Sequence, residues 1–284
     1  MKHLTVFALV LAAPFTACST EEGAAPADVA PPGPHVVTLS MASGAFEAPD
    51  TLDAGLTTFH FANHGDEVHY AHAVRLDSGR TVPELLAAYG EAVRTAGPRP
   101  TWLTRSGGPG GTAPGDTSSV THVIGPGRYA WICPVDGPDG NPHLATGEAR
   151  PFVVRAAAPD AVEPPAPTAS LVIRLVNYAF AVDAPLTPGH HTIRVANEGP
   201  DPHDMVMVRL ESGKTADDVR AWLRGGEGPP PFSMAGGVAV LAPGMEAFFE
   251  ADLTPGEYAL FCMATAQDGR THIEHGMIQQ VRVS

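Results

Sequence analysis

Two short stretches of this 284-residue chain carry the same potential metal ligands in the same order and at the same spacing. In the first stretch, Cys133 follows an apolar run, and His143 comes after nine intervening residues. In the second stretch, Cys262 and His272 have the same separation, and Met277 follows after four further residues. A thiolate, imidazoles and a thioether together suit copper better than any hard cation. The spacing therefore predicts a soft-metal site near each cysteine.

Each copy also supplies a histidine further upstream. The stretch from Asn63 to His69 matches the stretch from Asn197 to His203. Both follow segments in which apolar and polar residues alternate, a pattern typical of a half-buried strand that runs into a turn. Such a repeat predicts two copies of one structural unit. The two candidate ligand sets are His69, Cys133 and His143 in the first copy, and His203, Cys262 and His272 in the second.

Composition favours an all-β fold. The chain has 30 glycines and 29 prolines, many of them at turns such as residues 113–115, 242–244 and 254–256. Short apolar runs separated by such turns are typical of a sandwich or barrel. Lysine and arginine number 17 against 31 aspartates and glutamates, which gives a net charge of −14. Because no basic patch stands out, nucleic acid is not an expected partner.

The first residues predict export. A short basic start is followed by an apolar run at 4–17 that is too short to span a bilayer, as in a secretory signal peptide. The run ends in Phe15-Thr16-Ala17-Cys18, which resembles the lipobox of bacterial lipoproteins, although Phe15 stands where leucine is usual. The resemblance implies cleavage before Cys18 and lipid attachment to its sulfur. We therefore expect a lipoprotein at the periplasmic face of a membrane, with the outer membrane favoured, or at the cell surface. The alternative is an ordinary signal peptide with a chance cysteine.

The remaining chain divides by composition. The stretch after Cys18 is rich in glutamate, alanine and proline, as in a disordered tether, and a second proline-rich stretch reads as a semi-stiff linker. Once Cys18 is assigned to lipid, each domain holds one cysteine, so a disulfide between Cys133 and Cys262 is disfavoured. The expected parts are a signal peptide at 1–17, a tether at 18–34, domain 1 at 35–156, a linker at 157–168 and domain 2 at 169–284.

Each domain is expected to contain one short helix inserted into a β framework. Thr81 with Glu84, and Thr215 with Asp218, have the spacing of N-terminal capping boxes. After each helix a glycine-rich segment predicts a loop, and two strands then finish the unit, the first of which carries the cysteine. These glycine-rich segments are residues 107–111 and 236–237.

Together these features resemble the cupredoxin, or blue copper, family. They comprise the Asn-x-Gly stretch that leads to a histidine, the Pro-Gly-x-Tyr-x-x-x-Cys strand and the His-x4-Met motif with glycine before the methionine. The loop from His272 to Met277 is similar to the blue-copper loop of copper nitrite reductases. The resemblance implies two tandem Greek-key β-sandwiches. It also implies a type 1 copper site in domain 2, with Met277 as a weak axial ligand beside the trigonal ligands His203, Cys262 and His272.

The two candidate sites differ at the axial position. Domain 1 has Glu148 where domain 2 has Met277, and each follows a glycine. A possible second metal site therefore consists of His69, Cys133, His143 and Glu148. A carboxylate favours Cu(II), so copper bound in domain 1 would have a lower reduction potential than copper in domain 2. The alternative is that domain 1 keeps the fold with a weakened or empty site.

The same resemblance argues against an oxidase or a nitrite reductase. Those enzymes need a second copper centre, which uses a histidine next to the cysteine or His-x-His pairs. Here Ile132 and Phe261 precede the two cysteines, and the sequence has no His-x-His pair. The expectation is a non-enzymatic periplasmic protein that transfers electrons to or from a protein partner that the sequence does not name. Two alternatives stay open: a copper store or chaperone, and a copper-free interaction module.

Overall fold

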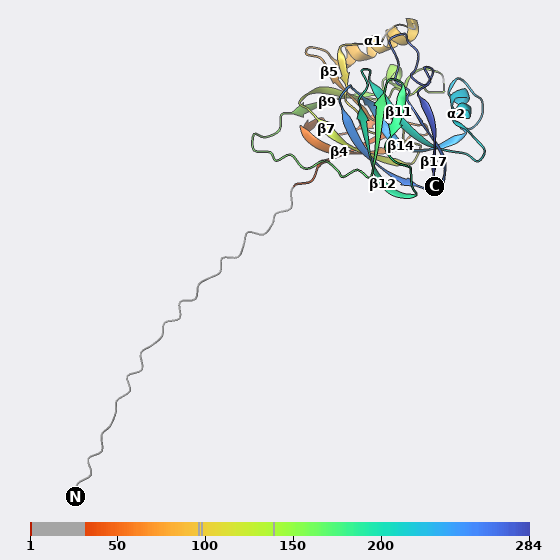
Figure 1. Cartoon of the computed structure of the whole chain (residues 1–284). Helices are drawn as coiled ribbons and strands as arrows, with labels where there is room; N and C mark the ends of the chain where they lie inside the picture. The colour runs from red at the N-terminus through yellow and green to blue at the C-terminus, as the bar shows by residue number, and fades with distance from the viewer. Residues whose placement is uncertain (2–31, 96, 98, 139) are drawn as a thin grey trace. The chain divides into compact units, whose positions relative to one another are not determined.

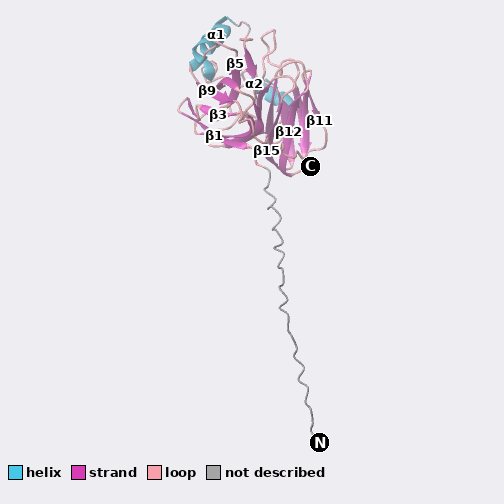
Figure 2. Ribbon diagram, turned by 90° about the vertical axis from the view of Figure 1, so that its left-hand side faces the viewer, coloured by secondary structure: helices cyan, strands magenta, loops and turns pink. Residues whose placement is uncertain are grey.

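Segments of alternating apolar residues form strands in the computed structural model, which describes Met1 and residues 32–95, 97, 99–138 and 140–284. The predicted signal peptide, the lipidation site at Cys18 and nearly all of the predicted tether lie outside these residues. Strands make up the body of the unit that begins at Pro32, and two short helices lie at its periphery (Figure 1, Figure 2). The predicted all-β class is confirmed.

The first repeat contains the following elements in chain order: β1 (His35–Ala42), β2 (Ala45–Glu47), β3 (Thr51–Asp53), β4 (Gly55–Asn63), β5 (His72–Leu76), α1 (Val82–Thr95), β6 (Leu103–Arg105), β7 (Thr117–Ile124), β8 (Gly127–Ile132), the 3₁₀ turn η1 (His143–Thr146) and β9 (Ala149–Arg155). The second repeat contains β10 (Leu171–Val176), β11 (Ala179–Val182), β12 (Gly189–Asn197), β13 (His203–Leu210), α2 (Ala216–Leu223), β14 (Phe232–Leu241), β15 (Glu246–Leu253), β16 (Gly256–Phe261) and β17 (Ile278–Val283).

One eight-stranded sheet runs through both repeats, in the order β11-β10-β12-β15-β7-β4-β1-β2. Equivalent strands lie at equal distances from its centre, where β15 and β7 pair antiparallel through Phe248 with Thr121 and Phe249 with Val120. The two sandwiches are therefore related by a local twofold axis. The two strands predicted to finish each repeat are present, as β8 and β9 and as β16 and β17, but a strand that the sequence analysis missed, β7 or β15, precedes them. Polar β7 keeps its place at the sheet centre through side-chain bonds such as Thr58 Oγ1 to Thr121 Oγ1, at 2.8 Å.

The second layer also continues across the boundary between the repeats. It consists of the sheets β3-β9-β8-β5-β6 and β14-β13-β16-β17. The amide of Gly107 donates to Val240 O at 3.0 Å, and the amide of Ala239 donates to Gly108 O at 2.9 Å. The glycine-rich segments are thus not the predicted loops: one lies within β14, and the other joins β5 to β14.

Close backbone approach explains the glycines in these segments. A Cβ atom on Gly108 would lie 2.2 Å from Ala71 O, and one on Gly237 would lie 2.2 Å from Met205 O. Both residues have a positive φ, which glycine adopts without strain. The glycine-rich pattern therefore marks positions that require glycine. The reason is the close approach of neighbouring strands rather than the turn of a loop.

Both predicted capping boxes are present. Thr81 and Glu84 exchange side-chain and backbone hydrogen bonds ahead of α1, and Thr215 and Asp218 do the same ahead of α2. Neither helix in the described part of the chain is long and apolar enough to cross a membrane. The linker at 157–168 holds neither helix nor strand, and Glu163 within it accepts a bond from Leu56 N at 2.8 Å.

Candidate metal centres

Domain 2 brings His203, Cys262 and His272 together. His203 is the first residue of β13, Cys262 directly follows β16, and His272 lies in the connection from β16 to β17. The Nδ1 atoms of the two histidines lie 2.9 Å apart, and they are 3.8 and 3.4 Å from the sulfur. An ion about 2.0–2.3 Å from three such ligands needs them roughly 3.5 Å from one another. The three atoms therefore converge at distances that suit one metal ion.

Backbone hydrogen bonds fix the connection that carries these ligands. The amide of His272 donates to Ala264 O at 2.8 Å, and that of Ile273 donates to Cys262 O at 2.9 Å. Met277 N donates to His272 O at 2.9 Å, while Cys262 N donates to Met277 O at 3.2 Å. The Met277 side chain is fully buried. The predicted axial residue is thus tied by its backbone to two of the predicted ligands.

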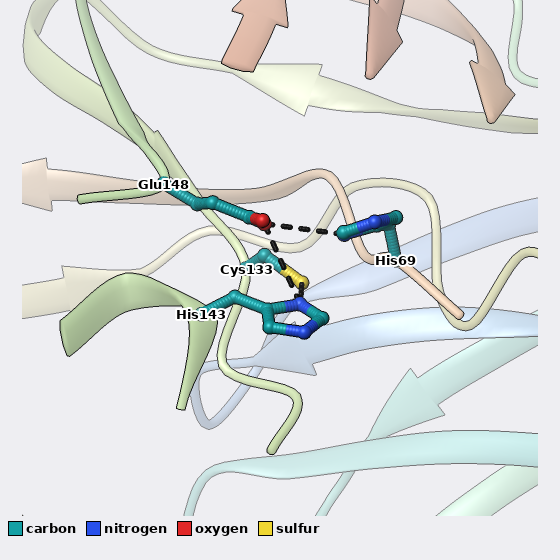
Figure 3. A group of neighbouring side chains, drawn as sticks. All are labelled: His69, Cys133, His143 and Glu148. Carbon is teal, nitrogen blue, oxygen red and sulfur yellow. Dashed lines mark hydrogen bonds and ion pairs between the residues drawn. The ribbon is translucent and has the colours of Figure 1, made fainter. Parts of the chain in front are cut away.

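Domain 1 gathers a four-residue group at the corresponding place (Figure 3). The ligand atoms of His69, Cys133, His143 and Glu148 all lie within 4.8 Å of one another, and all four residues are buried. Glu148 Oε2 lies 3.1 Å from His69 Nδ1 and 3.5 Å from His143 Nδ1, which is 3.4 Å from Cys133 Sγ. Every residue predicted for the possible second site is therefore brought together.

Two atoms of the domain 1 group lie close together without forming a hydrogen bond. His69 Nδ1 and Glu148 Oε2 are both buried, and neither has a hydrogen-bond partner of acceptable geometry among the described residues, despite their 3.1 Å separation. Buried polar atoms are usually paired. A cation bound between them would supply the missing partner to both.

Glu148 and Met277 occupy equivalent backbone positions. Glu148 N donates to His143 O at 3.0 Å, and Cys133 N donates to Glu148 O at 3.3 Å. These bonds repeat those that Met277 makes in domain 2. The exchange of a carboxylate for a thioether is therefore a change of side chain within an unchanged frame.

Burial favours the neutral forms of the domain 2 ligands. The neutral imidazoles can bind a metal as they are, whereas the thiol must lose its proton. It lowers the pKa of His203, and together with the charge of His203 it lowers the pKa of His272 to about 4, so both imidazoles are neutral at pH 7. Burial raises the pKa of the Cys262 thiol well above 9.0, and the negative charge of Asp204 raises it further. A bound cation acts in the opposite direction, because it stabilises the thiolate.

The domain 1 thiol is under similar control. Burial raises the pKa of Cys133 to about 12, against the lowering effect of hydrogen bonds from the backbone, and the charge of Glu148 raises it further. The amide of Tyr70 is one such donor, at 3.4 Å from Cys133 Sγ. Cys133 and Cys262 are both free rather than disulfide-bonded, as the sequence predicted.

The Asn-x-Gly element of the repeat anchors each early histidine. Asn63 Nδ2 donates to Glu67 O and Thr112 O at 2.7 and 2.8 Å, and its Oδ1 accepts from Gly65 N. Asn197 makes the equivalent three bonds in domain 2. A buried asparagine therefore ties the loop before each histidine to the neighbouring strand. Sequence reasoning found the motif but not this role.

Three residues near the sites were missed. Glu67 accepts a bond from His143 Nε2 at 2.6 Å, which leaves Nδ1 free to bind a metal. Buried Asp204 accepts from the amides of Met263 and Ala264 at 2.7 and 3.2 Å, just after Cys262. The Tyr178 ring packs nearly perpendicular to the His272 ring, with 4.7 Å between the ring centroids. Only Glu67 and Asp204 had a sequence signal, namely a carboxylate within two residues of a candidate ligand.

Other histidines lie apart from these groups. His72 is buried but belongs to neither ligand group. His275 contacts Asp268 at 3.1 Å and stands beside Tyr178. His190 is exposed and pairs with Glu250 and Asp252. None of these three histidines is a member of either ligand group.

Comparison with solved structures returns blue copper proteins and copper enzymes. Auracyanin A, a "blue" copper protein from Chloroflexus aurantiacus, is 21% identical; the match covers 43% of this chain and all of that one, with a TM-score of 0.31. The copper nitrite reductase of Nitrosomonas europaea is 14% identical over 89% of this chain and 94% of its own, with a TM-score of 0.26. A laccase from Botrytis aclada is 10% identical over 89% of this chain and 52% of its own, with a TM-score of 0.25.

No family model and no curated protein matches the chain. The predicted cupredoxin-like architecture is confirmed by the sandwich of strands in each repeat and by the two His/Cys groups.

Proposed function

We propose that this chain is a copper-binding electron-transfer protein whose redox centre lies in domain 2. The convergence of His203, Cys262 and His272 on one point carries the proposal. Bound copper would supply one-electron chemistry there. The buried thiolate and imidazoles hold it, the backbone bonds of the connection keep them in place, and Met277 is the proposed weak axial ligand. Ligands fixed before the ion arrives favour electron transfer, because little has to move when the charge changes.

Burial separates this proposal from the alternatives. A copper store or chaperone needs exposed ligands that exchange easily, whereas His203, Cys262 and His272 are at most 1% exposed. A copper-free interaction module would have no use for a buried thiol flanked by two imidazoles, whose burial costs free energy. Slow removal of copper by a chelator would support electron transfer, and rapid removal would favour a store or chaperone. The missing histidines beside both cysteines support a role without catalysis.

Copper analysis and visible spectroscopy of the purified two-domain chain test the proposal. We expect at least one copper per chain and an intense thiolate-to-Cu(II) band. A protein that takes up copper without such a band would contradict the proposed site.

Met277→Leu is expected to keep copper bound and to raise the reduction potential of domain 2. The thioether is a weak donor that favours the oxidised ion, so its removal favours Cu(I). A tenfold change in that preference corresponds to about 59 mV, and we expect a rise of roughly that size. Protein-film voltammetry measures it, with Met207→Leu in the core of β13 as a matched control. An unchanged potential would show that Met277 is not an axial ligand.

The proposed place of action is the periplasmic side of a membrane, through lipid on Cys18. The apolar run at 4–17 and the small residues before Cys18 support this. Two or more acyl chains give stable anchoring where one does not. Mass spectrometry of the membrane fraction is expected to find the mature chain starting at a lipid-modified Cys18. An unmodified cysteine there would refute the anchor. The proposed partner is a redox protein that meets the chain at the periplasmic side of this membrane.

A further inference from the structure

The two ligand groups differ in the charge that they present to an ion. In domain 1 the thiolate of Cys133 and the carboxylate of Glu148 supply two negative charges, so a divalent ion makes the buried group neutral. In domain 2 the thiolate of Cys262 is the one anionic ligand in the group, so a monovalent ion makes it neutral. A net charge in a buried site is costly, which favours the ion that cancels it.

Glu67 adds to this difference. Its carboxylate accepts from His143 Nε2 at 2.6 Å, which makes the imidazole a stronger donor at Nδ1. In domain 2, the ring of His272 packs nearly perpendicular to the ring of Tyr178 instead, with 4.7 Å between the ring centroids. Asp204 is a further buried carboxylate beside the Cys262 thiol, and in addition to burial its charge raises the pKa of that thiol. Its Oδ1 is held by two backbone amides and it is not a member of the ligand group, so the difference in charge concerns the ligand atoms alone.

Donor type and geometry point the same way. Two imidazoles, one thiolate and one carboxylate are ligands that Zn²⁺ binds tetrahedrally, at about 2.0–2.3 Å. A carboxylate is a hard donor that favours a divalent ion much more strongly than the soft, weak thioether of domain 2 does. The separations of 3.1, 3.4 and 3.5 Å within the domain 1 group fit four ligands around one such ion. An ion bound there would also satisfy His69 Nδ1 and Glu148 Oε2, which are buried without a hydrogen-bond partner.

We propose that domain 1 is a divalent-metal site that holds Zn²⁺ and takes no part in electron transfer. The chain then carries two different ions: a redox-inert divalent ion in domain 1 and the cycling copper in domain 2. The selectivity comes from Glu148 and is supported by Glu67. The zinc site stands independently of the copper proposed for domain 2, because its ligands all come from the first repeat.

Single-site variants of the full chain test the proposal. Cys262→Ala leaves the domain 1 group, and Cys133→Ala leaves the domain 2 group. Zn²⁺ affinity is measured by competition with a chromophoric chelator, and Cu(I) affinity with a Cu(I)-specific chelator. We expect the Cys262→Ala chain to bind one Zn²⁺ at least 100-fold more tightly than the Cys133→Ala chain, and the order to reverse for Cu(I). Equal Zn²⁺ affinities would overturn the proposal.

An axial exchange in these chains assigns the selectivity to one side chain. Glu148→Met within the Cys262→Ala chain is expected to lower Zn²⁺ affinity by at least tenfold while Cu(I) affinity holds or rises. Met277→Glu within the Cys133→Ala chain, the matched control, is expected to raise Zn²⁺ affinity. If Glu148→Met leaves Zn²⁺ affinity unchanged, the carboxylate is not a ligand and the proposal fails.

The unaltered chain provides a test that does not depend on how the variants fold. Titrated with Co²⁺ as a coloured substitute for Zn²⁺, it is expected to bind one tight equivalent with a thiolate-to-Co²⁺ band, which Zn²⁺ then removes. Two equal equivalents, or none, would overturn the proposal. Failure of the copper site in domain 2 would change the Cu(I) affinities but leave the Zn²⁺ and Co²⁺ results unchanged, so the two proposals can fail separately.

Discussion

Cys262→Ala is expected to abolish the intense visible absorption of the copper-loaded chain. The band requires a thiolate bound to Cu(II), and Cys262 is the thiol that lies 3.4 and 3.8 Å from the two domain 2 imidazoles. Loss of an outer partner of a ligand already costs about 10–100-fold in metal affinity. Loss of the thiolate itself should therefore lower copper affinity in domain 2 by more than 100-fold.

The repeat supplies a matched control for this experiment. Cys133→Ala removes the equivalent thiol of domain 1 and is expected to leave the domain 2 band in place. Visible spectra of both variants, loaded with one equivalent of copper, measure the difference. If the band survived in Cys262→Ala and vanished in Cys133→Ala, the redox centre would lie in domain 1 and the proposed assignment would be reversed.

The ligands could be predicted because most of them lie close together in the sequence. Cys262, His272 and Met277 lie in one connection between two strands, and the repeat shows the same spacing twice. The early histidine is distant in sequence, but the buried asparagine that anchors it, Asn63 or Asn197, leaves a recognisable Asn-x-Gly signature. Because the same anchoring motif and ligand spacing occur in both repeats, comparison of the two repeats was enough to identify the ligands.

The contacts around the ligands could not be predicted in the same way. Glu67 and His143 are far apart in the chain and meet only because two strand connections converge. Nothing in the pattern of one strand specifies which charged residue of another connection will face it. The structure places Glu148 among the ligands of domain 1 (Figure 3) and Glu67 behind His143, and the difference in charge between the two sites follows from these contacts.

The junction of the repeats was missed for a related reason. The pattern of Gly107, Gly108, Gly236 and Gly237 indicates backbone freedom but not its use. In the structure, Pro109 and Val238, which occupy equivalent positions, form a bridge across the local twofold axis. A single repeat contains only half of this interface, so its pairing depends on the other copy rather than on local sequence.

Acid is expected to destabilise the chain through a histidine at this junction. His72 begins β5 and is 3% exposed; it has a hydrogen bond with the backbone of Val240 in domain 2, while its Nε2 has no partner among the described residues. Burial, with a smaller effect of Arg105, lowers its pKa from 6.5 to about 3. The unfolded chain therefore takes up a proton at His72 in a range where the folded chain does not.

The sign of the effect follows from proton uptake. Above about pH 6.5 neither state is protonated at His72 and its contribution is constant; as pH falls from 6.5 toward 3 the unfolded state gains stability. Each pKa unit is worth about 1.4 kcal/mol, so His72 should cost on the order of 2–3 kcal/mol between pH 7 and pH 4.5. Buried His122, whose pKa burial lowers to about 4, acts in the same direction.

Comparison with His72→Gln isolates this contribution. Glutamine is neutral throughout and retains a donor for the Val240 backbone, so the stability of this variant should fall less in acid. Denaturant unfolding of the metal-free chains at pH 7, 6, 5 and 4.5 measures it, and the metal ligands titrate alike in both. We expect the difference in unfolding free energy between wild type and His72→Gln to change by about 2–3 kcal/mol across this range.

The control is the substitution His190→Gln at an exposed histidine. A hydrogen bond with Asp252 raises the pKa of His190 in the wild type, so its small contribution to the pH dependence of stability should have the opposite sign. Parallel curves for wild type and His72→Gln would mean that the proton at this junction does not control acid stability.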